Sequence, residues 1–300
     1  MPHLIVVADG GLGNRLWPIV SALSMRTSLP KYTVNVLWIK NQSCDITCND
    51  LFNDNIVSTI NLEEVITIKP WFGIELITHK KHYCNNLVNR GISGRFKLQP
   101  HIVDALLQKE KDLIIDTPHA LQSHYVNREL FPVIFRSILK GSVYTNIMDT
   151  IQTLKLDSSC VGCHLRGTDN PESSPNQIQQ TVNRIKKNSD NHRFFVCSDM
   201  KEIETQFKET PHVVMYDKTA YVTKKDPRHR KGFVQNVMRS ADSVLQSLTD
   251  VCCLSLCDTS REEYHTYKVS TFLAISRAIR GWEHCDYTTP TEKTTIDTFE

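Results

Sequence analysis

The sequence has no long hydrophobic run and almost no excess of one charge. Its 300 residues hold 35 Lys and Arg against 33 Asp and Glu, a formal net charge of +2. A net charge this close to zero provides no bulk attraction to nucleic acid or to an anionic membrane surface. No apolar stretch approaches the roughly 20 residues that span a bilayer, and the N-terminal run Leu4–Ala8 ends at Asp9. These absences predict a cytoplasmic protein with no nucleic-acid partner and no membrane span.

A second paired-cysteine motif is also absent. Of the ten cysteines, Cys160 and Cys163 form a C-x-x-C, a spacing found in zinc and redox sites, but no matching pair stands at zinc-ribbon spacing. Several of the others lie in apolar runs, where free cysteine behaves as a small buried hydrophobe. We therefore expect reduced, buried thiols and no metal, with a zinc or redox protein as the third-ranked alternative.

The chain does contain a regular alternation of short apolar runs and helical patterns. The predicted strands are Leu4–Ala8, Val34–Ile39, Val65–Ile68, Leu113–Asp116, Val161–Leu165, Phe194–Ser198, Val213–Tyr216 and Cys252–Leu256. The predicted helices are Leu16–Ser28, Gln122–Lys140, Val143–Leu154, Ile178–Lys187, Met200–Glu209, Asn236–Asp250 and Ser270–Arg280. Strands that alternate with helices indicate an α/β fold with parallel sheets.

The pattern restarts near residue 158, after a long helical stretch. It predicts an N-terminal α/β domain over residues 1–150, a second over 151–285, and a loose tail over 286–300 that is poor in apolar residues.

A glycine-rich segment, D-G-G-L-G-N-R-L from Asp9 to Leu16, joins the first strand to the first helix. Glycine lets the backbone approach a ligand closely, and a helix start favours anions. A dinucleotide fingerprint requires a third glycine where Leu16 stands, so a nicotinamide dehydrogenase is disfavoured. The candidate contacts are Gly11, Gly13, Asn14 and Arg15, and a plain tight turn is the alternative.

A second segment, C-H-L-R-G-T-D from Cys163 to Asp169, follows a buried strand. Ligands of open α/β sheets bind at the carboxyl ends of the strands, where Arg166 and Asp169 fall. The planar guanidinium of Arg166 suits a diphosphate. The alternative is a local Arg166–Asp169 ion pair that orders the loop.

Three further segments carry polar groups with two interpretations each. Ser198 and Asp199 end the strand F-F-V-C-S-D, where Asp199 either caps the next helix or accepts hydrogen bonds from a base or ribose. Ser270 and Thr271 open a helix, as caps or as a phosphate site. The basic run Lys224–Lys231 is a solvated face or a clamp on an anion, and it lacks the aromatics that stack single-stranded nucleic acid.

Taken in order, these segments resemble the α1,2/α1,6/O-fucosyltransferase superfamily of inverting glycosyltransferases. G-G-L-G-N-R-L resembles its N-terminal glycine motif, and Trp38–Phe52 its tryptophan, cysteine and D-L-F landmark. H-L-R-G-T-D resembles its donor motif, with F-F-V-C-S-D and the stretch Leu254–Phe272 as the later ones. The resemblance runs from residue 9 to residue 280, nearly the whole chain.

The resemblance implies a GT-B fold, with two Rossmann-like domains facing across a cleft. It implies transfer of L-fucose from GDP-fucose, as donor substrate, to a hydroxyl of a glycan acceptor, without a bound metal or other cofactor. Arg166 would stabilise the departing GDP, and Asp169 and Glu172 are the nearest candidates for the catalytic base. The donor would be bound by His164, Arg166, Ser198, Asp199, Ser270, Thr271 and Phe272, and the sugar and acceptor would face Gly11, Gly13, Asn14 and Arg15.

The sequence also departs from this pattern. Several relatives have two consecutive arginines, but Gly167 follows Arg166 here, so one cationic contact is missing or comes from elsewhere, with Lys224–Lys231 as a candidate. The lack of a membrane anchor suits a bacterial or viral enzyme. The alternatives are the same fold acting on a UDP-sugar, and a noncatalytic protein that binds a nucleotide or sugar.

Overall fold

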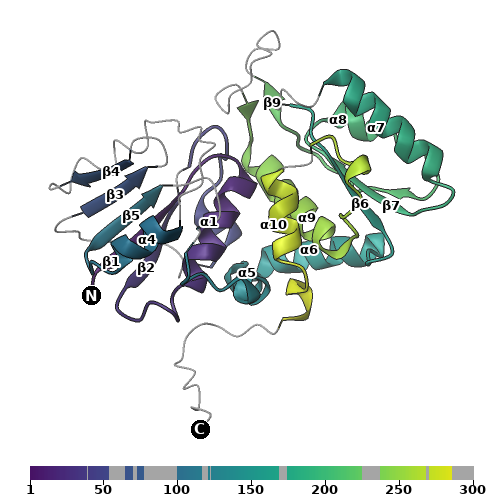
Figure 1. Cartoon of the computed structure of the whole chain (residues 1–300). Coiled ribbons are helices and arrows are strands. Elements are labelled where there is room, and N and C mark those ends of the chain that lie inside the picture. Colours follow the sequence, from purple (N-terminus) through teal and green to yellow (C-terminus); the bar gives the residue numbers. More distant parts are fainter. Residues whose placement is uncertain are drawn as a thin grey trace.

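The computed structural model describes residues 1–38, 40–53, 65–69, 73–77, 100–116, 121, 123–168, 174–224, 237–267 and 270–285. In it, two sheets lie on opposite sides of a layer of helices (Figure 1). Strands alternate with helices along most of the described chain, as the sequence pattern predicts.

The first sheet has the strand order β2-β1-β5-β3-β4. Its members are β1 (His3–Ala8), β2 (Thr33–Trp38), β3 (Val65–Lys69), β4 (Gly73–Ile77) and β5 (Asp112–Asp116). The central strand β1 pairs in parallel with β2 and β5, with Val6 opposite Val36 and Ile115. Among the described strands of this sheet, β4 at the edge is the one that runs antiparallel. The near-continuous apolar character of β1 reflects burial of the strand on both faces.

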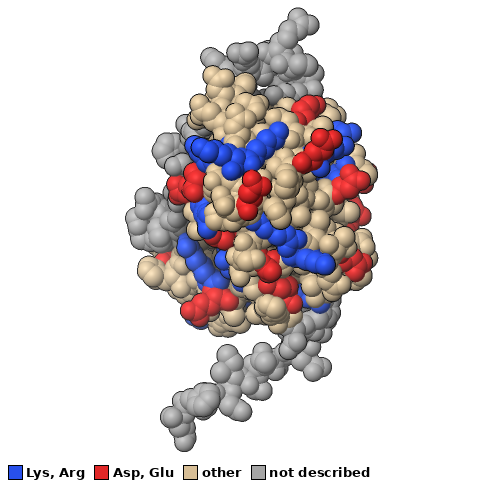
Figure 2. Space-filling model, turned by 90° about the vertical axis from the view of Figure 1, so that its right-hand side faces the viewer, with Lys and Arg blue, Asp and Glu red and all other residues tan. Residues whose placement is uncertain are grey.

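The second sheet is parallel and contains β6 (Val161–Leu165), β7 (Phe194–Ser198) and β8 (Val213–Val214). Helices α7 (Pro175–Asn188) and α8 (Lys201–Thr205) cover its outer face. Two short strands, β9 (Thr223–Lys224) and β10 (Val237–Met238), form an antiparallel pair nearby. On the side that carries α7, basic and acidic side chains are interspersed (Figure 2).

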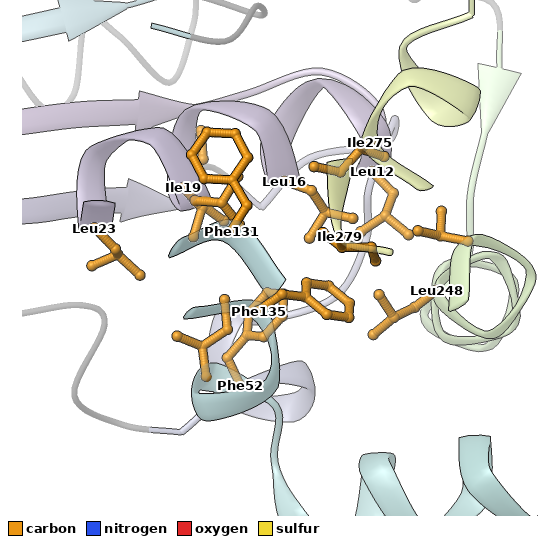
Figure 3. Close-up of a cluster of buried hydrophobic side chains, with 14 of the residues drawn as sticks. Leu12, Leu16, Ile19, Leu23, Phe52, Phe131, Phe135, Leu248, Ile275 and Ile279 are labelled. Carbon is orange, nitrogen blue, oxygen red and sulfur yellow. The ribbon is translucent and has the colours of Figure 1, made fainter. Parts of the chain in front are cut away.

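The main hydrophobic core lies in the layer of helices between the sheets. Side chains of α1 (Leu12–Ser24), α5 (Phe131–Ile138), α9 (Ala241–Leu256) and α10 (Thr271–Ala278) converge there (Figure 3). Helix α6 (Gly141–Leu154) adds one buried face to the same cluster. This core holds the starts of α1 and α10 close together.

The remaining described elements are short, apart from α4 (Pro100–Leu107). They are α2 (Cys48–Leu51) and the 3-10 turns η1 (Arg128–Leu130), η3 (Glu262–Tyr264) and η4 (Trp282–His284). Within the described ranges, we find no helix with the length and apolar character that crossing a bilayer requires.

One predicted strand is wrong. Residues Cys252–Leu256 form the last turns of helix α9, and nearly all of this apolar run is buried. A helix buried on most sides shows no amphipathic period, so its apolar run resembles a buried strand.

The first helix also differs from its prediction. It begins at Leu12 instead of Leu16, which puts Gly13, Asn14 and Arg15 in its first turn and Pro18 in its interior. The domain boundaries at residues 150 and 285 stay predictions.

Candidate functional site

A pocket with about 730 Å³ of space, part of it open to solvent, lies where the glycine-rich segment meets the ends of β6 and β7. Polar and charged side chains share its wall with a few apolar ones. The lining residues are Gly11, Leu12, Gly13, Asn14, His164, Arg166, Ser198, Asp199, Val222, Arg239, Val244, Ser247, Asp250, Thr271 and Phe272. Most of the predicted contact residues therefore meet in one place, although they are spread over the whole sequence.

Gly13 sits where the starts of α1 and α10 touch. A Cβ atom on Gly13 would lie 3.1 Å from the backbone nitrogen of Phe272 and 3.2 Å from its Cα. Beside this contact, the Thr271 hydroxyl donates a hydrogen bond of 2.8 Å to Asn14 Oδ1. The two segments that the sequence predicts on opposite sides of a cleft are thus in direct contact at the pocket.

Arg239, which the sequence analysis missed, lines the pocket beside Gly11. A Cβ atom on Gly11 would lie 3.8 Å from Arg239 Cζ. The backbone N–H of Arg239 donates to the Gln42 carbonyl at 2.9 Å, and its carbonyl accepts from the Asp45 N–H at 3.0 Å. Its only sequence signal is that it follows the predicted basic run, of which residues 225–236 lie outside the described ranges.

Arg15 does not line the pocket, although it is predicted to face the sugar or acceptor. Its side chain is fully buried, with Nε donating to the Gly10 carbonyl at 2.7 Å and Nη1 to the Ala8 carbonyl at 3.1 Å. Its guanidinium also stacks 4.6 Å above the Trp38 ring. Burial lowers the pKa of Arg15, and Asp9 opposes that effect. Arg15 therefore supports the glycine turn from behind.

Hydrogen bonds to Thr266 and Asp199 hold the backbone at and just after Arg166. Its N–H donates to the Thr266 hydroxyl oxygen at 2.7 Å, and that hydroxyl donates to the Arg166 carbonyl at 3.1 Å. The Asp199 carboxylate accepts from the Gly167 N–H at 2.7 Å and from the Thr168 hydroxyl. Asp199 thus fixes the loop that presents Arg166 and does not cap α8, whose N-cap residue is Met200.

The position after Arg166 is closely packed. A Cβ atom on Gly167 would lie 2.5 Å from Met200 Sδ and 2.8 Å from Ile203 Cδ1. A second arginine at this position would require those side chains to move. In this chain, the second guanidinium on the pocket wall is that of Arg239.

His164 forms part of the pocket wall together with the start of α10. Its ring stacks on Phe272, with centroids 4.6 Å apart and planes 19° from parallel. Ser270, which is buried, lies 3.5 Å from His164 Nδ1 and accepts a hydrogen bond from the Phe272 N–H at 3.2 Å. Ser270 is therefore a helix cap, one of its two predicted interpretations. Its predicted donor contact, and that of Thr271, stay predictions.

His265 supports this wall from behind, and sequence reasoning missed it. Its Nδ1 accepts a hydrogen bond of 3.2 Å from the His164 backbone N–H, and its Nε2 lies 3.1 Å from the Thr259 carbonyl. Burial lowers the pKa of His265, so the ring is neutral at pH 7. A neutral ring with its proton on Nε2 satisfies both contacts.

Asp250 is another lining residue that the sequence analysis missed, and after Arg239 it is the second with a charged side chain. It is 5% exposed, its Oδ2 accepts a hydrogen bond of 2.9 Å from Lys218 Nζ, and its Oδ1 has no hydrogen-bond partner among the described residues. Burial raises the pKa of Asp250 to about 7, and the nearby Lys218 opposes that rise. Val244, Ser247 and Asp250 are spaced three residues apart on α9 and share one face.

The C-x-x-C cysteines are buried at the start of β6. Neither Cys160 nor Cys163 is exposed, and burial raises the pKa of the Cys163 thiol. Among the residues with described positions, no group of three or more His, Cys, Asp or Glu could hold a metal ion. The candidate bases Asp169 and Glu172 lie outside the described ranges and stay predictions.

Comparison with known proteins gives structural but not sequence matches. No family model matches the chain, and no curated protein matches its sequence. The α1,6-fucosyltransferase NodZ, co-crystallised with GDP, is similar in structure over 92% of this chain and 91% of its own, with a TM-score of 0.53 and 16% identity. A second structure, of the fucosyltransferase NodZ from Bradyrhizobium, is similar over 92% of both chains, again with a TM-score of 0.53 and 16% identity. POFUT1 in complex with GDP-fucose covers 93% of this chain and 94% of its own, with a TM-score of 0.47 and 12% identity.

The matches to NodZ confirm the predicted fold class and, at the level of the fold, the predicted resemblance. The chain has an α/β fold with parallel sheets that is similar to the fold of NodZ, and the predicted arrangement of two domains across a cleft stays a prediction.

Proposed function

We propose that this chain is an inverting fucosyltransferase that moves L-fucose from GDP-fucose to a hydroxyl of a glycan acceptor. The observation that carries the proposal is the pocket, which gathers the predicted donor residues around Arg166 and adds Arg239 and Asp250. The fold adds support, because NodZ has the same fold and was co-crystallised with GDP.

The base of the nucleotide fits best beside α9. Val222 and Val244 provide apolar surface there, and Asp250 provides a carboxylate whose Oδ1 is buried and has no hydrogen-bond partner in the described part of the chain. Guanine presents two adjacent donors, its N1–H and its 2-amino group, whereas uracil presents one N–H. In its ionised form the carboxylate of Asp250 only accepts hydrogen bonds, which favours GDP over UDP.

The diphosphate fits best between the two arginines. Arg166 approaches from the end of β6 and Arg239 from the side of Gly11, so the cations come from different parts of the chain. As the acceptor hydroxyl attacks the anomeric carbon, the bond to GDP breaks and negative charge grows on the β-phosphate oxygen. Preorganised guanidinium groups stabilise such charge, and we propose that they do so without a metal or other cofactor.

The acceptor side is formed by the glycine-rich segment. Gly11, Gly13 and Asn14 line the pocket together with Arg166, and the sugar and acceptor would lie against this segment. The base that takes the acceptor proton stays assigned to Asp169 or Glu172, on the predicted grounds alone.

The test is transfer by Arg166→Ala with GDP-fucose and a panel of glycan acceptors. We expect turnover to fall by about 10²- to 10³-fold, because one preorganised cation is lost from the developing charge. The matched control is Arg128→Ala, which removes an exposed guanidinium from η1 and is expected to leave turnover unchanged.

Three outcomes would contradict the proposal. Turnover of a UDP-sugar but not of GDP-fucose would keep the fold and change the donor. Tight GDP binding with no turnover on any acceptor would indicate a noncatalytic nucleotide-binding protein. Near-wild-type turnover by a folded Arg166→Ala variant would show that the site is assigned wrongly.

A further inference from the structure

A buried cluster of charges lies directly behind the pocket. Lys218 Nζ forms an ion pair with Glu204 Oε1, donates to Asp250 Oδ2 at 2.9 Å and donates to the Ser198 carbonyl at 2.7 Å. The side chains of Lys218, Glu204 and Asp250 are only 4%, 6% and 7% exposed. One cation therefore faces two carboxylates in a place that water hardly reaches.

The ammonium group of Lys218 has no freedom left in this cluster. It has three N–H donors, and three acceptors on three different elements surround it: α8, α9 and the end of β7. Glu204 is held in turn, because Oε1 accepts from the Ser198 N–H at 2.7 Å and Oε2 from the Tyr221 hydroxyl at 2.7 Å. The cluster thus fixes Asp250 Oδ2, whereas Oδ1 is buried and has no hydrogen-bond partner among the described residues.

The charge on Asp250 depends on its two charged neighbours in opposite directions. Burial raises the pKa of Asp250 most, Lys218 lowers it, and Glu204 raises it further. The other groups that face it are Tyr216, Tyr221, Cys197, Cys253 and Asp199. Burial raises the pKa of each of these phenols and thiols above its ordinary value, so they stay neutral near pH 7.

We propose that Lys218 is a positioning residue, which holds the side chain of Asp250 at the pocket wall and balances its charge there. The identification of the ligand as a guanine nucleotide rests on the proposed function, but the coupling between Lys218 and Asp250 does not. Removing the positive charge of Lys218 should raise the pKa of Asp250, because the carboxylate loses its cationic neighbour in the cluster. Removing the negative charge of Glu204 should lower that pKa.

The experiment follows the ionisation of Asp250 directly, with ¹³C-labelled aspartate carboxyl groups in the full chain. The Asp250→Asn spectrum identifies the signal, which is then titrated in wild type, Lys218→Met and Glu204→Gln. We expect the midpoint to rise by about one pH unit or more in Lys218→Met and to fall in Glu204→Gln. Lys201→Met removes an exposed lysine from α8 and is the matched control, with no shift expected.

GDP affinity over the same pH range connects the cluster to the pocket. In wild type, the carboxylate that accepts from the ligand forms as the pH rises, so GDP affinity should rise about tenfold between pH 6 and pH 8. The rise should move to higher pH in Lys218→Met, to lower pH in Glu204→Gln, and vanish in Asp250→Asn. The Asp250→Asn profile also subtracts the titration of the phosphate groups themselves.

The outcomes separate the two proposals. Midpoints of Asp250 that coincide in all three proteins overturn the role of Lys218, as does an affinity loss that is equal at every pH. Opposite midpoint shifts with no GDP binding by wild type would keep the role of Lys218 and overturn the proposed function. If Lys218→Met fails to fold, the downward shift expected of Glu204→Gln decides the question.

Discussion

At the scale of single residues, two arginines that the sequence predicts to contact the ligand differ in where their side chains lie. Arg15 follows a glycine turn and is fully buried against backbone carbonyls, whereas Arg166 ends a strand and lines the pocket. The sequence predicts a ligand contact for both, because residue type and spacing do not show which way a side chain points. The strand end is the more reliable signal, since parallel strands direct their carboxyl ends to one edge.

The first residue-scale prediction concerns Arg239. Replacing Arg239 by alanine should weaken GDP binding by about 10- to 100-fold, because a hydrogen bond to a charged group contributes about 1.5–3 kcal/mol. Guanosine, which lacks phosphates, should bind the variant and the wild type equally. Arg239→Lys should recover part of the loss, since the charge returns without the planar fork. Calorimetry with both ligands makes the measurement, and an equal loss for GDP and guanosine would contradict a phosphate contact.

At the scale of secondary structure, the sequence predicts the strands that carry the site. The predicted bounds of β6 and β7, Val161–Leu165 and Phe194–Ser198, agree with the structure, because each is a short, mainly apolar run that a charged residue follows directly. Residues Cys252–Leu256 belong to a helix instead, because a fully buried run has no period to read.

Tertiary contacts explain why the rest of the site could not be predicted. Asp250 lies within α9, where nothing in the local pattern distinguishes it from an ordinary exposed helix residue. Its burial depends on Lys218, which is 32 residues away in sequence. Arg239 reaches the pocket because its backbone bonds to the segment around Gln42, a contact that no local pattern encodes.

The element-scale prediction concerns the contact between α1 and α10. In Gly13→Ala, the steric contact should lower the free energy of unfolding by about 1–3 kcal/mol. The higher helix propensity of alanine should offset roughly 1 kcal/mol of that loss. The reason is that the new Cβ meets backbone atoms of Thr271 and Phe272, which cannot rotate away. Urea denaturation followed by circular dichroism gives the value.

Gly141 provides the control for that prediction. It starts α6, and a Cβ atom there would meet nothing within 4 Å. Gly141→Ala should therefore be neutral or stabilising, by about 0.4–1 kcal/mol. If both variants had the same stability change, the close approach at Gly13 would not matter to the fold.

At the scale of the whole molecule, the pocket exists only because distant segments meet. Asn14 and Thr271 are 257 residues apart in sequence, yet their side chains share a hydrogen bond at the pocket. The helices between the two sheets bring these segments together, and their shared core keeps them there (Figure 3). The order of the motifs along the chain predicts that these segments form one site, although no single motif is specific.

The most direct test of the account is calorimetric titration of the full chain with GDP, with UDP and ADP under the same conditions. The account predicts saturable binding of GDP at one site, weaker binding of UDP and ADP, and loss of GDP affinity in Arg166→Ala. UDP binding as tight as that of GDP, or GDP binding that Arg166→Ala leaves unchanged, would contradict it.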